Sequence, residues 1–357
     1  MPYIYHKKKS RSISGILITA VLLLSAAVGG YLLLIQAPAV PENPGSAVGG
    51  FTTLAPTTTT TAPPPKPVFT AAKTAELDAQ INARQAMVMD LDESRVLYAR
   101  GEYDLCYPAS LTKLLTAAVV LTYCEPGDVF KVGGEIHLAE TDASSAYLLK
   151  GWELPVRVLL EGLLLPSGAD ASYTLAVNVA RIAHPELELS DAEAVAAFCE
   201  LMNEQAAALG CENTHFVNPD GYHSEDHYST PADMALICRA SLSYPAITAA
   251  CALSKAEGTL AVGGREWSNS NPLIREESPW YYPAANGLKT GYTSEAGHCL
   301  AATAEEDGVR LLVLVFGCPA SDLRSWDTVT LFEAGFSLLD DGHIPVAYAQ
   351  PTLKSEE

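Results

Sequence analysis

The chain has 357 residues, of which 48% are apolar and 18% are charged, and its formal net charge is −20. This composition excludes a wholly disordered chain, and the length suits one large domain with added segments or two smaller domains. Four of the 22 basic residues lie within the first twelve positions, at Lys7, Lys8, Lys9 and Arg11. The rest of the chain is therefore strongly acidic and repels phosphate backbones, which argues against a nucleic-acid partner.

The N-terminal region predicts a membrane anchor. Residues Gly15 to Ile35 form an uncharged apolar run, and about 20 such residues cross a bilayer as a helix. Basic residues precede this run, and none follows it before Lys66. The positive-inside rule then predicts a cytoplasmic segment (1–14), a single-pass signal-anchor helix in the cell membrane (15–36) and an extracytoplasmic remainder. The alternative is a cleaved signal peptide and a secreted protein, with Ala37-Pro38-Ala39 as the cleavage site.

The next segment is a predicted linker, and the rest of the chain is a predicted domain with a short tail. Residues 37–73 are rich in Pro and Thr and have no apolar periodicity, so they cannot bury a core. We expect one globular domain over residues 74–342 and a C-terminal tail over residues 343–357.

The globular domain is predicted to be α+β. Apolar and polar residues alternate over positions 86–99 on both sides of a polar turn, which indicates an antiparallel hairpin. A helix that is apolar on all sides, and hence buried, is expected over residues 110–121. Further helices are expected over 154–182 and 190–209, three strands between 286 and 317, and a closing helix over 320–338. This order predicts one antiparallel sheet built from both ends of the domain, with a flanking helical region.

The eight cysteines do not indicate a metal or redox site. They stand at positions 106, 124, 199, 211, 238, 251, 299 and 318, and no two of them have C-x-x-C spacing. We expect several to be small buried hydrophobic residues, and we do not expect a catalytic cysteine.

Ser110 and Lys113 form an S-x-x-K pair at the start of the predicted buried helix. Residues three apart share a helix face, so the amine can reach the hydroxyl. Burial would lower the pKa of the lysine and allow it to act as a base toward the serine. The alternative is a serine cap followed by a surface lysine.

Two further short motifs follow. Lys289-Thr290-Gly291 falls on a predicted strand edge, where Lys and Thr can hold a carboxylate and glycine allows close approach of a ligand. Its alternative interpretation is a strand-end turn with a solvated lysine. Ser167-Gly168-Ala169-Asp170 opens a helix, and the alternative there is a plain N-cap formed by Ser or Asp.

These motifs, in this order, resemble the signature of the active-site serine penicillin-binding proteins. Residues 77–339 resemble the D-alanyl-D-alanine carboxypeptidases of the S11 peptidase type, the low-molecular-weight penicillin-binding proteins, whose fold is the β-lactamase/transpeptidase type. The resemblance extends to YPASLTKLLTA, LLLPSGADAS, HFVNPDGYHSEDHYSTPADMALICRA and NGLKTGYTSEAGHCL.

The resemblance implies a role for each matching residue. Ser110 is similar to the acylated nucleophile, Lys113 to its base, and Ser167 to the serine that relays a proton to the leaving amine. Lys289, with Thr290 and Gly291, resembles the group that binds the terminal carboxylate region, and Arg324 resembles the arginine that assists it. The backbone N–H groups of Ser110 and Tyr292 would form the oxyanion hole. The implied partners are peptidoglycan stem peptides and β-lactams, with no metal or cofactor.

Two departures from the family pattern leave alternatives open. Ala169 stands where the family has an asparagine, and the chain ends soon after the catalytic domain, where many relatives carry a β-rich domain and an anchor. The leading expectation is a carboxypeptidase that releases the terminal D-alanine. The alternatives are a class A-like β-lactamase, which lacks support because the loop is S-G-A rather than S-D-N, and a catalytically weak cell-wall binding protein, which Ala169 favours.

Overall fold

The computed structural model describes residues 81–256, 266–339 and 351. The predicted cytoplasmic segment, anchor helix and linker (1–73) lie outside these residues, as does the predicted tail (343–357) apart from residue 351. In the described part, no single helix is long and apolar enough to cross a membrane. Two helices that meet at a 100° bend, Pro231–Leu242 and Pro245–Ala252, reach that length and composition only as a pair.

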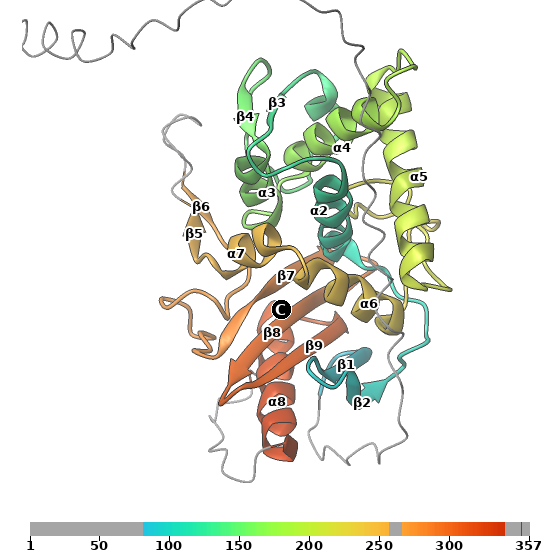
Figure 1. The fold of residues 1–357 in the computed structure, drawn as a ribbon. Coiled ribbons are helices and arrows are strands. Elements are labelled where there is room, and N and C mark those ends of the chain that lie inside the picture. Colours follow the sequence, from blue (N-terminus) through green and yellow to red (C-terminus); the bar gives the residue numbers. More distant parts are fainter. Residues whose placement is uncertain (1–80, 257–265, 340–350, 352–357) are drawn as a thin grey trace, which may run out of the picture. The chain divides into compact units, whose positions relative to one another are not determined.

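The domain is built on a five-stranded antiparallel sheet, as the sequence predicted. Its strand order is β2-β1-β9-β8-β7 (Figure 1). The strands are β1 (Gln85–Asp90), β2 (Arg95–Arg100), β7 (Ala285–Thr293), β8 (Gly297–Glu306) and β9 (Val309–Cys318). Strand β1 of the first hairpin therefore pairs with β9, the last strand. The predicted hairpin at 86–99 and the three predicted strands between 286 and 317 are confirmed.

Both faces of this sheet are buried, which explains the continuous apolar run of β9. Leu311, Val313 and Val315 belong to one apolar cluster, whereas Leu312 and Leu314 belong to the other. Side chains alternate between the faces of a strand, so a strand covered on both sides is apolar at every position.

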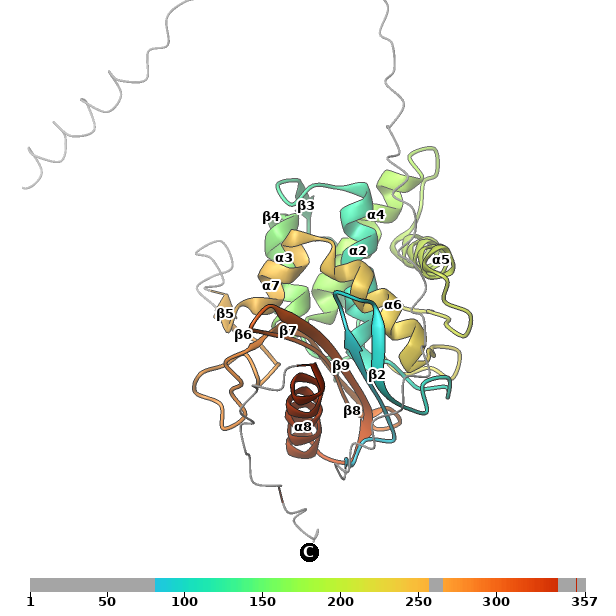
Figure 2. The ribbon, with the colours of Figure 1, turned by 60° about the horizontal axis from the view of Figure 1, so that its bottom comes forward.

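A single long helix covers one face of the sheet. Helix α8 (Ser321–Leu339) runs along this face in Figure 2. Its Phe332 and Phe336 belong to the same apolar cluster as Val88 and Leu311 of the strands. Its bounds differ by one residue at each end from the predicted closing helix at 320–338.

The other face is covered by a helical region. It comprises the 3₁₀ turn η1 (Ala109–Leu111), α2 (Thr112–Tyr123), α3 (Val156–Leu164), α4 (Ala169–Ala183), α5 (Asp191–Leu209), α6 (Pro231–Leu242) and α7 (Pro245–Ala252). Short elements complete it: β3 (Val129–Lys131), β4 (Glu153–Pro155), β5 (Lys255–Ala256), β6 (Trp267–Ser268) and the 3₁₀ turn η2 (Glu135–Leu138). The predicted buried helix corresponds to η1 and α2, and α2 is buried at every position from Thr112 to Val120.

The helical segment predicted over residues 154–182 is two helices, and the predicted start of a helix at Ser167–Asp170 is confirmed. The segment begins in strand β4, and α3 ends at Leu164, five residues before α4 begins. Pro166 interrupts the helix because proline lacks the N–H that the helical ladder needs. Ser167 follows it with a φ of +66°, a left-handed conformation that no helix interior adopts.

Helix boundaries elsewhere follow ordinary capping chemistry. Ser190 and Glu193 form a capping box at the start of α5, and Gly210 ends that helix with a φ of 91°. Thr230 caps α6, where Pro231 takes the first helical position. The sequence analysis did not predict α6 and α7, although the Thr-Pro pair is a helix-start signal.

The cysteines behave as buried apolar residues. Seven of them are buried free thiols, at positions 106, 124, 199, 238, 251, 299 and 318. Burial raises the pKa of the Cys124, Cys199 and Cys251 thiols to about 12, so these thiols stay protonated at neutral pH. None of the three is activated as a nucleophile.

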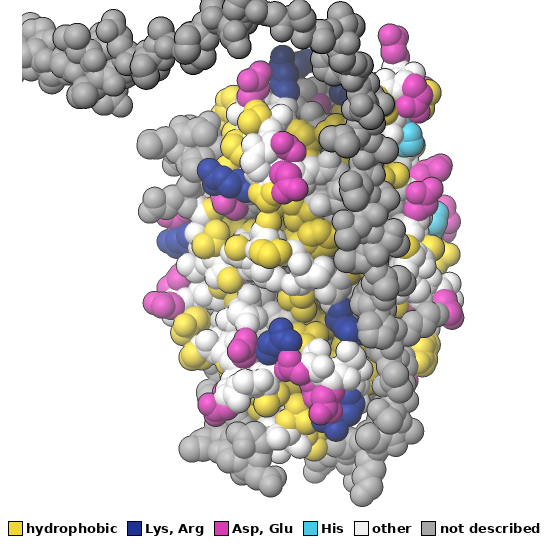
Figure 3. All heavy atoms as spheres, in the orientation of Figure 1, with side chains coloured by type: hydrophobic (Ala, Val, Ile, Leu, Met, Phe, Trp, Pro, Cys, Tyr) yellow, Lys and Arg dark blue, Asp and Glu magenta, His cyan; other side chains and the backbone are white. Residues whose placement is uncertain are grey.

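Charged side chains of both signs are mixed on the face of the domain seen in Figure 3. Lys and Arg side chains lie among Asp and Glu side chains and do not form a continuous basic stripe on this face. A stripe of that kind is what a protein needs to follow a phosphate backbone.

Candidate active site

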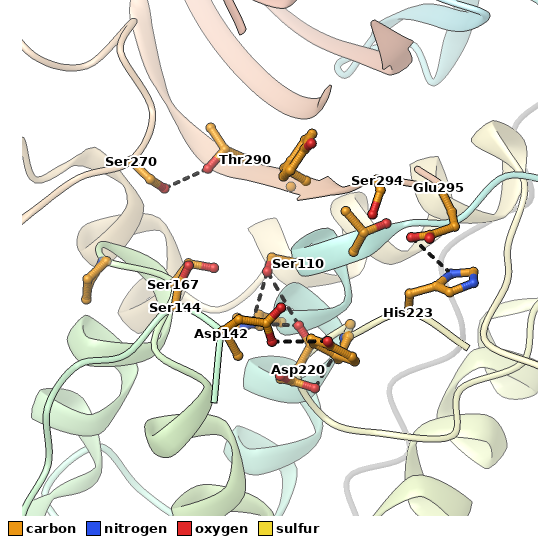
Figure 4. Close-up of a pocket in the computed structure, with 18 of the residues that line it drawn as sticks. Ser110, Asp142, Ser144, Ser167, Asp220, His223, Ser270, Thr290, Ser294 and Glu295 are labelled. Atoms are coloured by element: carbon orange, nitrogen blue, oxygen red, sulfur yellow. Dashed lines mark hydrogen bonds and ion pairs between the residues drawn. The ribbon is translucent and has the colours of Figure 1, made fainter. Parts of the chain in front are cut away.

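A serine and a lysine lie in contact where η1 runs into α2. Lys113 Nζ donates a hydrogen bond to Ser110 Oγ across 3.0 Å (Figure 4). Ser110 makes no side-chain cap on α2, and Lys113 is only 2% exposed. The alternative interpretation of a cap serine and a surface lysine is therefore wrong.

Burial makes the neutral form of Lys113 more accessible than that of an exposed lysine. Burial lowers the pKa of Lys113 to about 8. Its Nζ also donates to the backbone carbonyl of Asp220 across 2.5 Å, and Ser110 Oγ lies 3.5 Å from the same oxygen. The carbonyl fixes the position of the amine. A measurable fraction of this amine is neutral near pH 7 and can accept the serine proton.

The segment that carries Asp220 is tied to α2 by two threonines. Thr116 Oγ1 donates to the carbonyl of Pro219 across 2.7 Å, and Thr112 Oγ1 lies 2.8 Å from His227 Nε2. Burial holds the pKa of His227 at about 3, so its ring is neutral. Because the N–H of Val217 donates to His227 Nδ1, the proton of the ring is on Nε2 and is donated to Thr112. These contacts hold the acceptor of Lys113 in place.

Two glycines allow backbone segments to approach the nucleophile turn closely. Gly221 has a φ of +81°, and a Cβ at this position would overlap the carbonyl oxygen of Ala109. A Cβ on Gly291 of β7 would come within 2.9 Å of Leu111 and 3.1 Å of the Pro108 carbonyl. Gly291 thus allows β7 to approach the nucleophile turn closely.

Ser167 presents a buried hydroxyl to the same site. Its residue is 6% exposed, and its Oγ has no hydrogen-bond partner among the described residues. The left-handed φ of Ser167 costs on the order of 1 kcal/mol and is held by the surrounding structure. Such a hydroxyl is available for a bound molecule.

Asp170 fixes the loop beside Ser167. Its carboxylate accepts hydrogen bonds of 2.8 Å from Ser145 Oγ and from the N–H groups of Ala146 and Leu148. The N-cap of α4 is Gly168, and no side chain caps this helix. The plain N-cap interpretation of the segment is therefore wrong, because Asp170 positions a neighbouring loop instead.

Strand β7 supplies the opposite wall. Thr290 Oγ1 lies 2.6 Å from Ser270 Oγ. Lys289 is 1% exposed and donates to the carbonyl of Thr290 across 3.0 Å, so it is not a solvated lysine at a turn. Burial, and next the charge of Lys113, lower the pKa of Lys289 well below its ordinary value.

An arginine from α8 also reaches the site. Arg324 is 7% exposed, and its Nε has no hydrogen-bond partner among the described residues. Burial lowers its pKa, although the guanidinium remains charged. A buried cation with unused donors suits an anionic group of a ligand.

These groups surround a pocket of about 430 Å³. Of the predicted site residues, all but Lys289 line it: Ser110, Lys113, Ser167, Thr290, Gly291, Tyr292 and Arg324. Ala169, at the family's asparagine position, is 1% exposed and does not line the pocket.

Several lining residues were not predicted. They include Asp142, Ser144, Asp220, Tyr222, His223, Ser270 and Glu295. Four of the seven lie in segments that the resemblance already covered, but no motif marked them individually. No three His, Cys, Asp or Glu side chains in the described ranges lie close enough together to hold a metal ion.

Comparison with known proteins gives a consistent result. Residues 70–320 match the family model described as D-alanyl-D-alanine carboxypeptidase. D-alanyl-D-alanine carboxypeptidase DacF of Bacillus subtilis is 32% identical over 74% of this chain, and the match spans 64% of the DacF length. The D-alanyl-D-alanine carboxypeptidase of Streptomyces sp. strain K15 is 30% identical, with 74% of this chain and 91% of the relative covered.

Solved structures agree with this likeness. The crystal structure of the Streptomyces K15 DD-transpeptidase has a TM-score of 0.65 at 28% identity, covering 72% of this chain and 98% of that chain. Penicillin-binding protein D2 of Listeria monocytogenes, in its ampicillin-bound form, has a TM-score of 0.60 at 27% identity, with 72% and 98% covered.

Proposed function

This chain belongs to the D-alanyl-D-alanine carboxypeptidase family, and from that membership we propose that it releases the terminal D-alanine from peptidoglycan stem peptides. The reaction would pass through an acyl-enzyme on Ser110. One observation carries the proposal above all others: the 3.0 Å hydrogen bond between a buried lysine amine and the Ser110 hydroxyl. This is the arrangement of an activated serine nucleophile.

In the proposed acylation, neutral Lys113 takes the proton of Ser110 as Oγ attacks the carbonyl carbon of the penultimate residue. The N–H groups of Ser110 and Tyr292 would stabilise the negative charge on the carbonyl oxygen. The unpartnered hydroxyl of Ser167 would pass the proton held by Lys113 to the amine of the departing D-alanine, which returns Lys113 to its neutral form. Water then attacks the carbonyl carbon of the ester, and Lys113 takes a proton from that water and passes it to the departing Ser110 Oγ. The shortened peptide leaves as a carboxylic acid, and the free serine is restored.

Recognition of the terminal carboxylate is assigned to the basic side of the pocket. Arg324 is buried with an unpartnered Nε among the described residues, and Thr290 also lines the pocket. Lys289 would act through its contact with the Thr290 carbonyl, since Lys289 does not line the pocket. A substrate carboxylate would offset the charge of these buried cations.

A β-lactam would acylate the same serine. The Listeria penicillin-binding protein with the same fold was solved in an ampicillin-bound form, and a β-lactam presents a strained acyl group to the nucleophile. A carboxypeptidase should keep this adduct for hours, whereas a β-lactamase should hydrolyse it quickly.

The decisive experiment uses a fluorescent penicillin and a pentapeptide that ends in D-Ala–D-Ala. The parent should bind one penicillin per chain and should release D-alanine from the peptide. Ser110→Ala should do neither, whereas Ser243→Ala, a serine at the end of α6 and outside the pocket, should do both. Full labelling of Ser110→Ala would falsify the assignment, and a parent that labels but releases no D-alanine would support the binding-protein alternative.

We further propose that residues 15–36 anchor the protein in the cell membrane, with the catalytic domain on the outer side. The length of the apolar run and the basic residues before it support this placement. Fractionation of cells that express the full chain should find it in the membrane, with an intact N-terminus. A mature N-terminus near position 40 would show that the segment is a cleaved signal peptide.

A further inference from the structure

One arginine outside the pocket bonds the turn that forms part of its lining. The guanidinium of Arg84 donates from Nη2 to the backbone carbonyls of Glu295 and Ala296, across 3.0 and 2.9 Å. These carbonyls belong to the turn between β7 and β8, and Figure 4 shows Glu295 at the end of β7 beside the pocket. Arg84 itself does not line the pocket, so its contact with the site is indirect.

The turn leads directly to one of the donors assigned to the oxyanion hole. The N–H of Ala296 donates to Thr293 Oγ1 across 3.0 Å, so the turn is closed on the last residue of β7. The residue before it is Tyr292, which lines the pocket and whose N–H is the assigned donor. Glu295 follows Tyr292 by only three residues. A displacement of the turn would therefore move this N–H relative to Ser110.

The chain makes room for the Arg84 side chain at a glycine. Gly317 of β9 has a φ of +69°, and a Cβ at this position would overlap Arg84 Nε. Glycine adopts this left-handed conformation at little cost. The N–H of Arg84 also donates to the carbonyl of Phe316 across 2.9 Å. Both the backbone and the side chain of this exposed arginine are thus fixed against the end of β9.

The residues before Arg84 are held by the helix that carries Arg324. Asp327 is fully buried, and its carboxylate accepts hydrogen bonds from the N–H groups of Asn82 and Ala83 across 2.8 and 2.7 Å. The side-chain amide of Asn82 donates to the same carboxylate across 2.8 Å. Asp327 follows Arg324 by three residues, about one turn of α8. This short segment therefore bonds both the helix of Arg324 and the turn after β7.

We propose that Arg84 is a positioning residue for the reaction: its two hydrogen bonds hold the turn after β7 so that the N–H of Tyr292 stays aligned with the N–H of Ser110. The inference rests on the proposed function, because it needs the oxyanion hole, and it adds a residue that lies outside the pocket. A displaced donor stabilises the developing oxyanion less, which lowers the rate rather than the affinity for substrate. Removal of a whole oxyanion donor costs about 10²–10³-fold in kcat, so a displaced donor should cost about tenfold.

The test compares three variants of the full-length chain. Arg84→Met keeps an unbranched side chain but removes its donors, and Arg84→Lys keeps one donor group. Arg100→Met is the matched control, because Arg100 is also exposed and donates from Nη1 to the carbonyls of Ile81 and Ala83 in the same segment, but not to the turn. Each variant is titrated with a fluorescent penicillin, and kcat is expressed per labelled serine, so that misfolded chains do not count.

Arg84→Met should lower kcat on the D-Ala–D-Ala pentapeptide about tenfold and change KM by less than about twofold. Penicillin acylation should slow by a similar factor, because the β-lactam carbonyl would use the same oxyanion hole. Arg84→Lys should recover part of the loss in both assays, and Arg100→Met should match the parent. Hydrogen exchange of residues 293–297, followed by mass spectrometry, should be faster in Arg84→Met than in Arg100→Met.

The outcomes distinguish this inference from the proposed function. A parent-like kcat in Arg84→Met overturns the inference, as does a rise of KM alone, and both leave the carboxypeptidase assignment intact. An equal loss in Arg84→Met and Arg100→Met also overturns it, because the effect would then come from the segment and not from the turn. So does an Arg84→Lys variant as slow as Arg84→Met, because a restored donor would then have no effect. A parent that neither releases D-alanine nor binds penicillin refutes the proposed function, and with it the inference.

Discussion

Acylation of Ser110 should accelerate as pH rises through about 8, because only the neutral amine of Lys113 can take the serine proton. Burial lowers the pKa of Lys113 to about 8. The neutral fraction is then about 9% at pH 7 and about 91% at pH 9, so the acylation rate should increase about tenfold between these values. A lysine with the ordinary pKa of 10.5 would give an increase of about a hundredfold over the same range and no plateau.

The assay is stopped-flow acylation by a fluorescent penicillin from pH 5.5 to 9.5, at constant ionic strength. The second-order rate constant should rise with a slope of one at low pH and become flat above pH 9. Lys289 is the other buried amine beside this site, and the charge of Lys113 helps to lower its pKa.

The variant Lys289→Arg tests whether the rise of the acylation rate with pH comes from Lys113. Its guanidinium places a permanent positive charge near Lys113, which disfavours the ammonium form and should lower the pKa of Lys113. The midpoint of the acylation rate against pH should therefore move to lower pH, even if the maximal rate at high pH changes. A rate that is independent of pH between 6 and 9, or a midpoint near 10.5, would refute the assignment of Lys113 as a buried base.

Three other changes test the structure around the site. The parent's free energy of unfolding should fall by up to about 1.4 kcal/mol per pH unit as pH drops from 6.5 toward 3. The reason is that the buried ring of His227 stays neutral in the folded protein, whereas the same ring binds a proton in the unfolded chain. Denaturant titrations of His227→Gln should lack this contribution. Gly221→Ala should slow penicillin acylation at least tenfold, whereas Gly308→Ala, with a similar φ but open space around it, should acylate at the parent rate. Ala169→Asn should leave kcat/KM on the pentapeptide unchanged or raise it by no more than about a hundredfold. It should lower the melting temperature, because the methyl group that is replaced is 1% exposed. If the parent shows no turnover and Ala169→Asn restores it, the binding-protein alternative is favoured.

The sequence predicted those parts of the fold and site that depend on local pattern. The alternation of apolar and polar residues predicted the hairpin at 86–99. The apolar character of all sides of the helix at 110–121 predicted that Lys113 is buried. Three-residue spacing was sufficient to predict the contact of Lys113 with Ser110. Each of these properties is set within one turn or one strand pair.

Other parts of the site depend on contacts that sequence does not record. Asp220 holds Lys113 through its backbone carbonyl, so its side chain gave no signal. Asp142 and Glu295 belong to loops more than 150 residues apart and meet only in the folded pocket. The start of α4 after Pro166 was predicted from the Ser167–Asp170 motif, whereas the short strand β4 at the start of the segment gave no local signal.

The pairing of β1 with β9 has a consequence for when the enzyme becomes active. Met87 lies opposite Leu314, so the sheet joins segments that are synthesised more than 200 residues apart. Such long-range pairing gives a high contact order and slow folding. The wall formed by β7 cannot be fixed against the Ser110 turn until β9 has left the ribosome and joined the sheet. A nascent chain that stops before β9 should therefore be unable to capture penicillin, although it already contains Ser110, Lys113 and Lys289.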